Sequence, residues 1–125
     1  MKYDKLKKTE ELIVFEKRIV RLWESAKIPY PVHFSGGNEE QLIEIFREIE
    51  PEDYIFSTHR SHYHYLLKGG SEKELERMIM AGDSMHVYDR KLKFLTSSIV
   101  AGVCGIAAGT AYALKEKKSK SCPAA

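Results

Sequence analysis

The chain has 125 residues, which is enough for one domain or part of one and short for an enzyme that holds a large cofactor by itself. Its 20 Lys and Arg residues nearly balance 18 Asp and Glu residues, and charges of both signs are interspersed along the sequence. This balance excludes a broad basic face for a polyanion, so we expect no nucleic-acid partner.

The first half of the chain predicts two amphipathic helices. Apolar residues recur every three or four positions from Thr9 to about Lys27, and Pro-Tyr-Pro at 29–31 cannot continue that helix. Asn38 is a suitable N-cap for the second helix, with Gln41 placed three residues on. The apolar face of the second helix is expected to comprise Leu42, Ile45, Phe46 and Ile49.

The middle of the chain predicts a strand and a third helix. Tyr54–Phe56 is a short aromatic run of the kind found in buried strands. Ser71 and Glu74 form a capping-box pattern, and Gly82 is placed to end the helix that follows. Its inward residues are expected to be Leu75, Met78 and Ile79. The segment DSMHVYDRKLK, 83–93, is predicted to be a polar loop.

From Phe94 to Leu114 the chain has no charged side chain. That length suffices to cross about 30 Å of hydrocarbon, so a single membrane span is one interpretation. Its many Ser, Thr and Gly residues, and the lack of aromatic belts at both ends, favour a helix buried by protein instead. Gly105 and Gly109 form a small-residue face that lets another backbone approach closely in either setting.

The two cysteines, Cys104 in the uncharged run and Cys122 near the end, form neither a disulfide framework nor a zinc spacing. The N-terminus has no apolar block typical of a secretory signal. A reducing cytoplasm is the expected location.

The residues that could perform chemistry gather in the segment STHRSHYHYLLKGG. His59, Arg60, His62 and His64 lie within six positions, but no Cys, Asp or Glu nearby completes a metal site. One alternative is a turn whose imidazoles bond to the backbone. The other is an anion site, because Arg60 is always charged and its fork matches phosphate oxygens.

Two further histidines lie in predicted loops. His33 is in PVHFSGGN and His86 is in DSMHVY. An unperturbed pKa near 6.5 suits proton exchange at neutral pH, although a surface histidine without a role fits the same pattern.

Four of these segments together resemble the α subunit of thiamine-diphosphate-dependent 2-oxo acid dehydrogenases, the first component of pyruvate, branched-chain and acetoin dehydrogenase complexes. They are VHFSGGNEE, PEDYIFSTHRSH, GDSMHVY and IVAGVCGIAAGTAYALK, and the resemblance runs from about Leu22 to Lys115. It implies the N-terminal, mostly helical part of an α/β thiamine-diphosphate-binding fold. The implied layout is an N-terminal helix at 1–28, the front part of the diphosphate-binding domain at 29–115, and a basic tail or truncation end at 116–125.

The resemblance also implies roles for the candidate residues. Arg60 would bind the cofactor diphosphate, with His59 in place of the family's usual tyrosine. The backbone around Ser98 and Val100 would lie against the cofactor, with Ser98 in place of the usual glycine. His33 would exchange a proton with the reacting substrate, and His86 is a second catalytic candidate.

The implied activity is oxidative decarboxylation of a 2-oxo acid with acyl transfer to a lipoyl group. The implied partners are a β subunit, a second α subunit packed on the glycines of the last helix, and a lipoyl acyltransferase. On this interpretation protein rather than lipid buries the uncharged run, so no membrane is expected.

One departure from the family concerns Mg²⁺. The family holds this ion through a Gly-Asp-Gly motif and a later asparagine, and neither is in this sequence, which ends at Cys122-Pro-Ala-Ala, about where the family's next strand begins. We therefore assign no metal ligand and expect the chain alone to be inactive. The chain is then either the front of a longer subunit or a non-catalytic interaction module of the same fold.

Overall fold

The computed structural model of the chain describes residues 7–117 and 123–124. Helices α1, Thr9–Glu24, and α2, Glu39–Arg47, confirm the two predicted helices. Helix α1 ends before Lys27 because Ala26 takes a left-handed backbone conformation, with φ of 57°. Asn38 does precede α2, but its side chain makes no capping hydrogen bond, so that part of the prediction is wrong.

A small sheet forms the centre of the fold. Its strands are β1, Tyr54–Ser57, β2, Tyr88–Asp89, β3, Phe94–Thr96, and β4, Pro123–Ala124, in the order β2-β3-β1-β4. Strand β1 confirms the predicted strand and runs parallel to both β3 and β4, whereas β2 is antiparallel to β3. Strand β4 lies where the family resemblance places the next strand.

Three helices complete the described chain: α3, His62–Leu67, α4, Glu72–Met80, and α5, Gly102–Glu116. Helix α4 confirms the prediction, and Ser71 Oγ accepts the Glu74 backbone N–H at 3.1 Å. Glu74 itself pairs with Arg77, so only half of the predicted capping box forms.

Three sequence expectations differ from the structure. The uncharged run 94–114 is not one helix, because it begins as strand β3 and becomes helical only at Gly102. Strand β2 lies in the segment expected to be a polar loop, and α3 was not predicted. In the described ranges, no helix is long and apolar enough to cross a membrane. Cys122 and most of the predicted tail at 116–125 lie outside the described residues.

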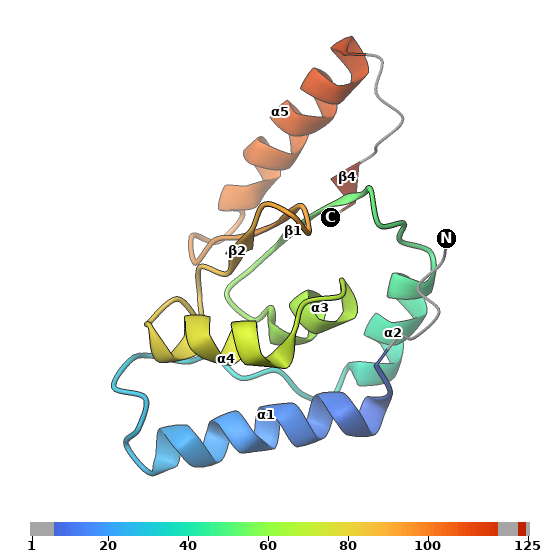
Figure 1. Cartoon of the computed structure of the whole chain (residues 1–125). Coiled ribbons are helices and arrows are strands. Elements are labelled where there is room, and N and C mark those ends of the chain that lie inside the picture. The colour runs from blue at the N-terminus through green and yellow to red at the C-terminus, as the bar shows by residue number, and fades with distance from the viewer. Residues whose placement is uncertain (1–6, 118–122, 125) are drawn as a thin grey trace.

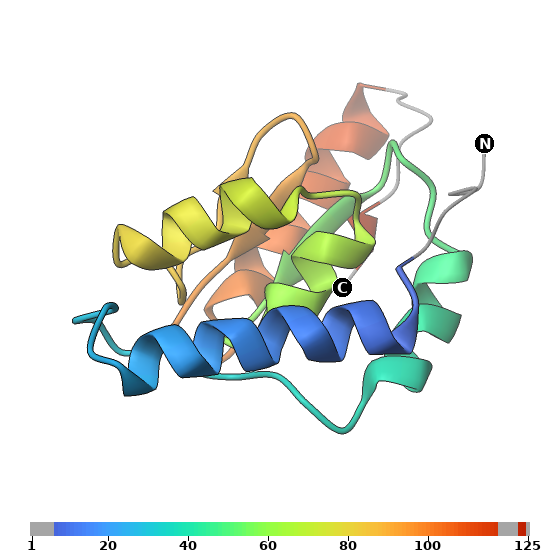
Figure 2. The same cartoon turned by 60° about the horizontal axis from the view of Figure 1, so that its bottom comes forward.

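The helices lie on both sides of the sheet. Helices α1, α3 and α4 are on one side, and α5 lies on the other and projects away from the body (Figures 1 and 2). Ile55 and Phe94 are paired in register and contribute to the core. On the face toward α5, a cavity of about 460 Å³ is lined by residues that include Tyr54, Phe56, Leu95 and Ile106.

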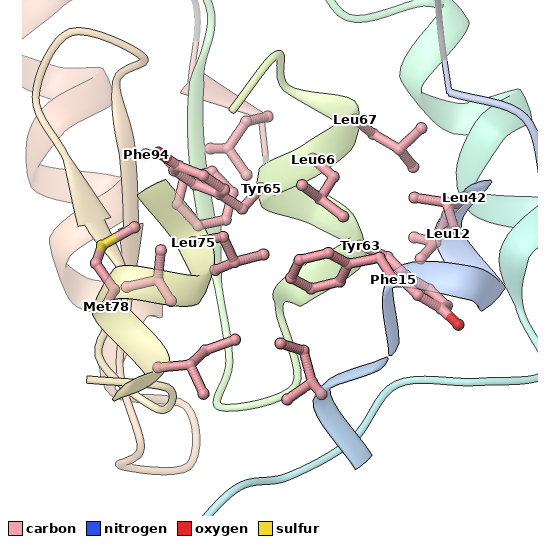
Figure 3. Packing of buried hydrophobic residues seen from close by; sticks show 14 of the residues in the cluster. Leu12, Phe15, Leu42, Tyr63, Tyr65, Leu66, Leu67, Leu75, Met78 and Phe94 are labelled. Carbon is pink, nitrogen blue, oxygen red and sulfur yellow. The ribbon is translucent and has the colours of Figure 1, made fainter. Parts of the chain in front are cut away.

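The hydrophobic core lies between the first four helices and the sheet (Figure 3). Helix α1 contributes Leu12, Phe15 and Ile19, each at most 1% exposed. The predicted inward residues of α4 are buried, but Ile45 of α2 is 55% exposed, contrary to the prediction. Other fully buried members of the core include Tyr63, Tyr65, Leu75, Ile79, Val87 and Phe94.

Lys68, at the end of α3, fixes the start of β1. Its side chain is buried, and Nζ donates to the carbonyl oxygens of Glu50, Pro51 and Asp53 at 3.0, 3.1 and 2.7 Å. A buried ammonium needs such acceptors to compensate for lost hydration. The contact holds the turn before β1 and therefore sets where that strand begins.

Candidate functional site

The candidate site lies at the carboxyl ends of the parallel strands β1 and β3. The two strand ends are joined where the Ser97 N–H donates to the Ser57 carbonyl at 3.2 Å. The loops that follow carry Arg60 on one side and Ser98 on the other. In open α/β sheets, ligands bind in the crevice beyond the carboxyl ends of the strands. The topology alone therefore favours this edge of the sheet as the place where a ligand binds.

Arg60 joins the loop after β1 to the loop before α2. Its Nη1 donates to the Phe34 carbonyl at 2.9 Å, and the residue is otherwise exposed. A guanidinium has five N–H donors. The bond to Phe34 engages one of them, so the other donors of this exposed side chain can serve an anion.

His33 and His59 lie beside Arg60. Their ring centroids are 4.6 Å apart, with an angle of 74° between the ring planes. Partial burial lowers the pKa of His33, and the neighbouring His59 and Arg60 lower it further. At neutral pH the His33 imidazole is therefore mainly uncharged and able to accept a proton. Three of the predicted site residues, from two separate loops, are brought together here.

His86 and Ser98 form a second pair at the same edge of the sheet. The Ser98 Oγ lies 3.4 Å from His86 Nε2. Ser98 begins the turn between β3 and α5, in which Val100 is 84% exposed and Ala101 takes a left-handed conformation with φ of 60°. A β-carbon at Gly102 would lie 3.1 Å from Ile99 Cβ, so the tight turn favours glycine there.

The structure gives His62 and His64 different surroundings from the loop histidines. Both lie on α3: His62 is fully buried, and burial lowers the pKa of His64 to about 4. Of the two alternatives to a metal site, the turn whose imidazoles bond to the backbone is therefore wrong for these two residues. His62 contacts the side chains of Glu16 and Ser84, and His64 packs edge-on against Phe46.

Sequence reasoning missed two residues that contact His62, namely Glu16 and Ser84. Glu16 is 4% exposed and lies between Phe15 and Ile19 on the apolar face of α1. A carboxylate in an apolar stripe was the available signal, because a buried carboxylate needs a partner.

The donor set of this site fits an anion and not a metal ion. Arg60, His59 and His33 supply cationic or neutral nitrogen donors, which suit a diphosphate. Mg²⁺ prefers oxygen ligands, and no group of three or more His, Cys, Asp or Glu residues in the described part of the chain is placed to hold a metal ion. Cys104 is an exposed free thiol.

Comparison with known proteins gives two findings. The sequence model of a family described as "Dehydrogenase E1 component" matches residues 7–125. The chain is also similar to the alpha subunit of acetoin:2,6-dichlorophenolindophenol oxidoreductase from Bacillus subtilis (strain 168). The two are 29% identical over a stretch that covers 89% of this chain and 36% of that protein. The chain therefore spans just over a third of the length of this curated relative.

Proposed function

Because the chain belongs to the dehydrogenase E1 component family, we propose that it forms the front part of the cofactor-binding domain in the α subunit of a thiamine-diphosphate-dependent 2-oxo acid dehydrogenase. The reaction proposed is oxidative decarboxylation of a 2-oxo acid with acyl transfer to a lipoyl group. The observation that supports this most strongly is the convergence of Arg60, His59 and His33 at the carboxyl ends of β1 and β3.

Arg60 and His59 are proposed to bind the diphosphate of the cofactor. The bond from Arg60 to the Phe34 carbonyl orients the guanidinium before any ligand binds, so less side-chain entropy is lost on binding. His59 replaces a tyrosine of the family and adds one imidazole donor. The backbone from Ser98 to Val100 lies in the turn before α5 and is proposed to line the same anion.

Thiamine diphosphate, when bound, supplies an electron sink for decarboxylation. His33 is proposed to exchange the proton that the reacting substrate gains and loses, because its lowered pKa keeps the ring neutral in the free site. His86 is proposed as a second proton-exchanging group, oriented by the Ser98 hydroxyl. The described residues do not fit Mg²⁺, so no step is assigned to that ion.

Helix α5 supports the proposal that partner subunits complete the domain. None of its described residues is buried, although the helix is mostly apolar. A β-carbon built at Gly105 or Gly109 meets no atom within 4 Å, so this face is open to close approach. A second α subunit is proposed to cover it, with a β subunit completing the active site and a lipoyl acyltransferase accepting the product.

A non-catalytic module of the same fold is the second candidate. It is favoured by the lack of a metal-binding group in the described ranges. The two candidates differ in whether the chain contributes to cofactor binding, alone or with a β subunit.

The test is calorimetric titration of thiamine diphosphate with Mg²⁺ into the chain, with and without a β subunit. Arg60→Ala should weaken cofactor binding by about 1.5–3 kcal/mol through loss of a charge-assisted contact. Arg21→Ala, which removes an exposed arginine on α1, is the matched control and should leave the affinity unchanged. Equal affinities for wild type and Arg60→Ala would exclude the proposed role. Binding only by a chain extended through the family's Gly-Asp-Gly motif would favour the front part of a longer subunit, and no binding even by that chain would favour the non-catalytic module.

A further inference from the structure

A buried row of hydrogen bonds joins four segments behind the candidate site, namely α1, the loop before α2, the start of α3 and the turn after α4. Glu16 of α1, His62 at the start of α3 and Ser84 after α4 are 4%, 0% and 0% exposed. His62 Nδ1 lies 3.1 Å from Glu16 Oε1 and 2.9 Å from Oε2, and His62 Nε2 lies 2.9 Å from Ser84 Oγ. The Ser35 backbone N–H donates to Glu16 Oε1 at 2.6 Å.

The partners determine where the protons lie. A carboxylate accepts hydrogen bonds, and Glu16 already accepts the Ser35 N–H. The His62 proton that faces Glu16 is therefore on Nδ1. In a neutral ring, Nε2 is then the acceptor for the Ser84 hydroxyl proton.

This order of carboxylate, imidazole and hydroxyl is the one found in nucleophilic hydrolases. Here the hydroxyl belongs to Ser84, which no substrate can reach because the residue is fully buried. The imidazole is also packed edge-on against Phe15, with ring centroids 6.5 Å apart. The row therefore does not react with a substrate. Its role is to hold the segments that it connects.

Each end of the row is next to a residue of the candidate site. Ser35 follows Phe34, whose carbonyl accepts the Arg60 guanidinium, and His33 precedes them. His62 lies two positions after Arg60 in the sequence. Ser84 lies two positions before His86, which contacts Ser98. All three loops that carry the candidate side chains are thus attached to one buried group of atoms.

We propose that Glu16, His62 and Ser84 are positioning residues, which act through the loops to hold His33, Arg60 and His86 at the site. This inference deepens the proposed function and rests on it for the meaning of the site. A core carboxylate that served stability alone would need no connection to these loops. The hydrogen bonds donated by the Ser35 amide and by the Ser84 hydroxyl supply that connection at opposite ends.

The test compares variants of the full chain by the ring resonances of His33, His59 and His86 in nuclear magnetic resonance spectra, and by affinity for inorganic pyrophosphate. Glu16→Gln keeps the side-chain shape but replaces one carboxylate oxygen with an amide donor, so a single oxygen must accept from both the Ser35 N–H and the His62 Nδ1–H. Ser84→Ala removes the hydroxyl at the opposite end. Two controls on α1 are Glu24→Gln, which changes an exposed carboxylate, and Ile19→Ala, which destabilises the core without removing a hydrogen bond of the row.

The proposal predicts that Glu16→Gln moves the ring resonances of His33 and His59 and weakens pyrophosphate binding on the order of tenfold. Ser84→Ala should move the His86 resonances and, through His62, those of His33 as well. If both variants lose stability as Ile19→Ala does, yet keep wild-type ring resonances and affinity, the positioning role is wrong.

Two further outcomes remain decisive. If Glu16→Gln does not fold, Ser84→Ala decides alone: moved His33 resonances support the proposal, and unmoved ones overturn it. If the wild-type chain does not bind pyrophosphate, the proposed anion site has failed, and the ring resonances still decide whether the row positions the loops.

Discussion

The body formed by α1 to β3 and the helix α5 are both rich in apolar residues, but only the body buries them within the chain. The body contains the whole described cluster of buried apolar side chains. In α5, no described residue is buried, and Ile106 and Tyr112 are 46% and 68% exposed. Apolar composition therefore does not by itself show burial by the same chain. The contrast supports a partner surface on α5, which we have proposed above.

Matched substitutions in the body and in α5 should give the largest difference in the free energy of unfolding. Ile19→Ala, at a fully buried position of α1, should lower the free energy of unfolding by about 3–4 kcal/mol through lost burial and a residual cavity. Ile106→Ala, at a half-exposed position of α5, should change it by less than about 0.5 kcal/mol. Denaturant unfolding of the isolated chain measures both. Equal losses would mean that α5 is part of the core, contrary to the comparison.

A smaller effect on folding is expected from Gly109→Leu on the open face of α5. Leucine has the higher helix propensity, and its β-carbon meets no atom within 4 Å in this chain. The isolated chain should therefore be unchanged or stabilised by up to about 1 kcal/mol. Association with a second α subunit, measured by sedimentation, should be weakened because the side chain blocks close approach. Unchanged association would remove the glycine face from the proposed interface.

The helices of the body were predictable because their apolar spacing matches their burial. Leu12, Phe15 and Ile19 repeat at helical intervals, and all three are buried. The same signal fails for Phe94–Thr96, since a short apolar run next to an apolar helix fits a strand or a helix equally well. Helix α3 was missed because it has only 6 residues, His, Tyr and Leu without a clear helical period, and Ser61 makes no side-chain cap.

The candidate site was predictable in part. The residue types of Arg60 and its flanking histidine indicated an anion site, and His33 was a separate candidate for proton exchange. The structure places Arg60, His59 and His33 together. Their support by Glu16 and Ser84 was not predictable from spacing. Glu16 contacts the His62 ring from 46 positions away in the sequence, and Ser84 contacts the same ring from 22 positions away. Only the folded chain determines such pairings.

The most direct test of the anion site is the pKa of His33, measured by its ring resonances with and without inorganic pyrophosphate. In the free chain this pKa should lie below the ordinary value, because of partial burial and the neighbouring His59 and Arg60 side chains. A bound anion favours the imidazolium, so pyrophosphate should raise the pKa, and Arg60→Ala should abolish that rise. A His33 pKa that is the same with and without pyrophosphate would contradict the account.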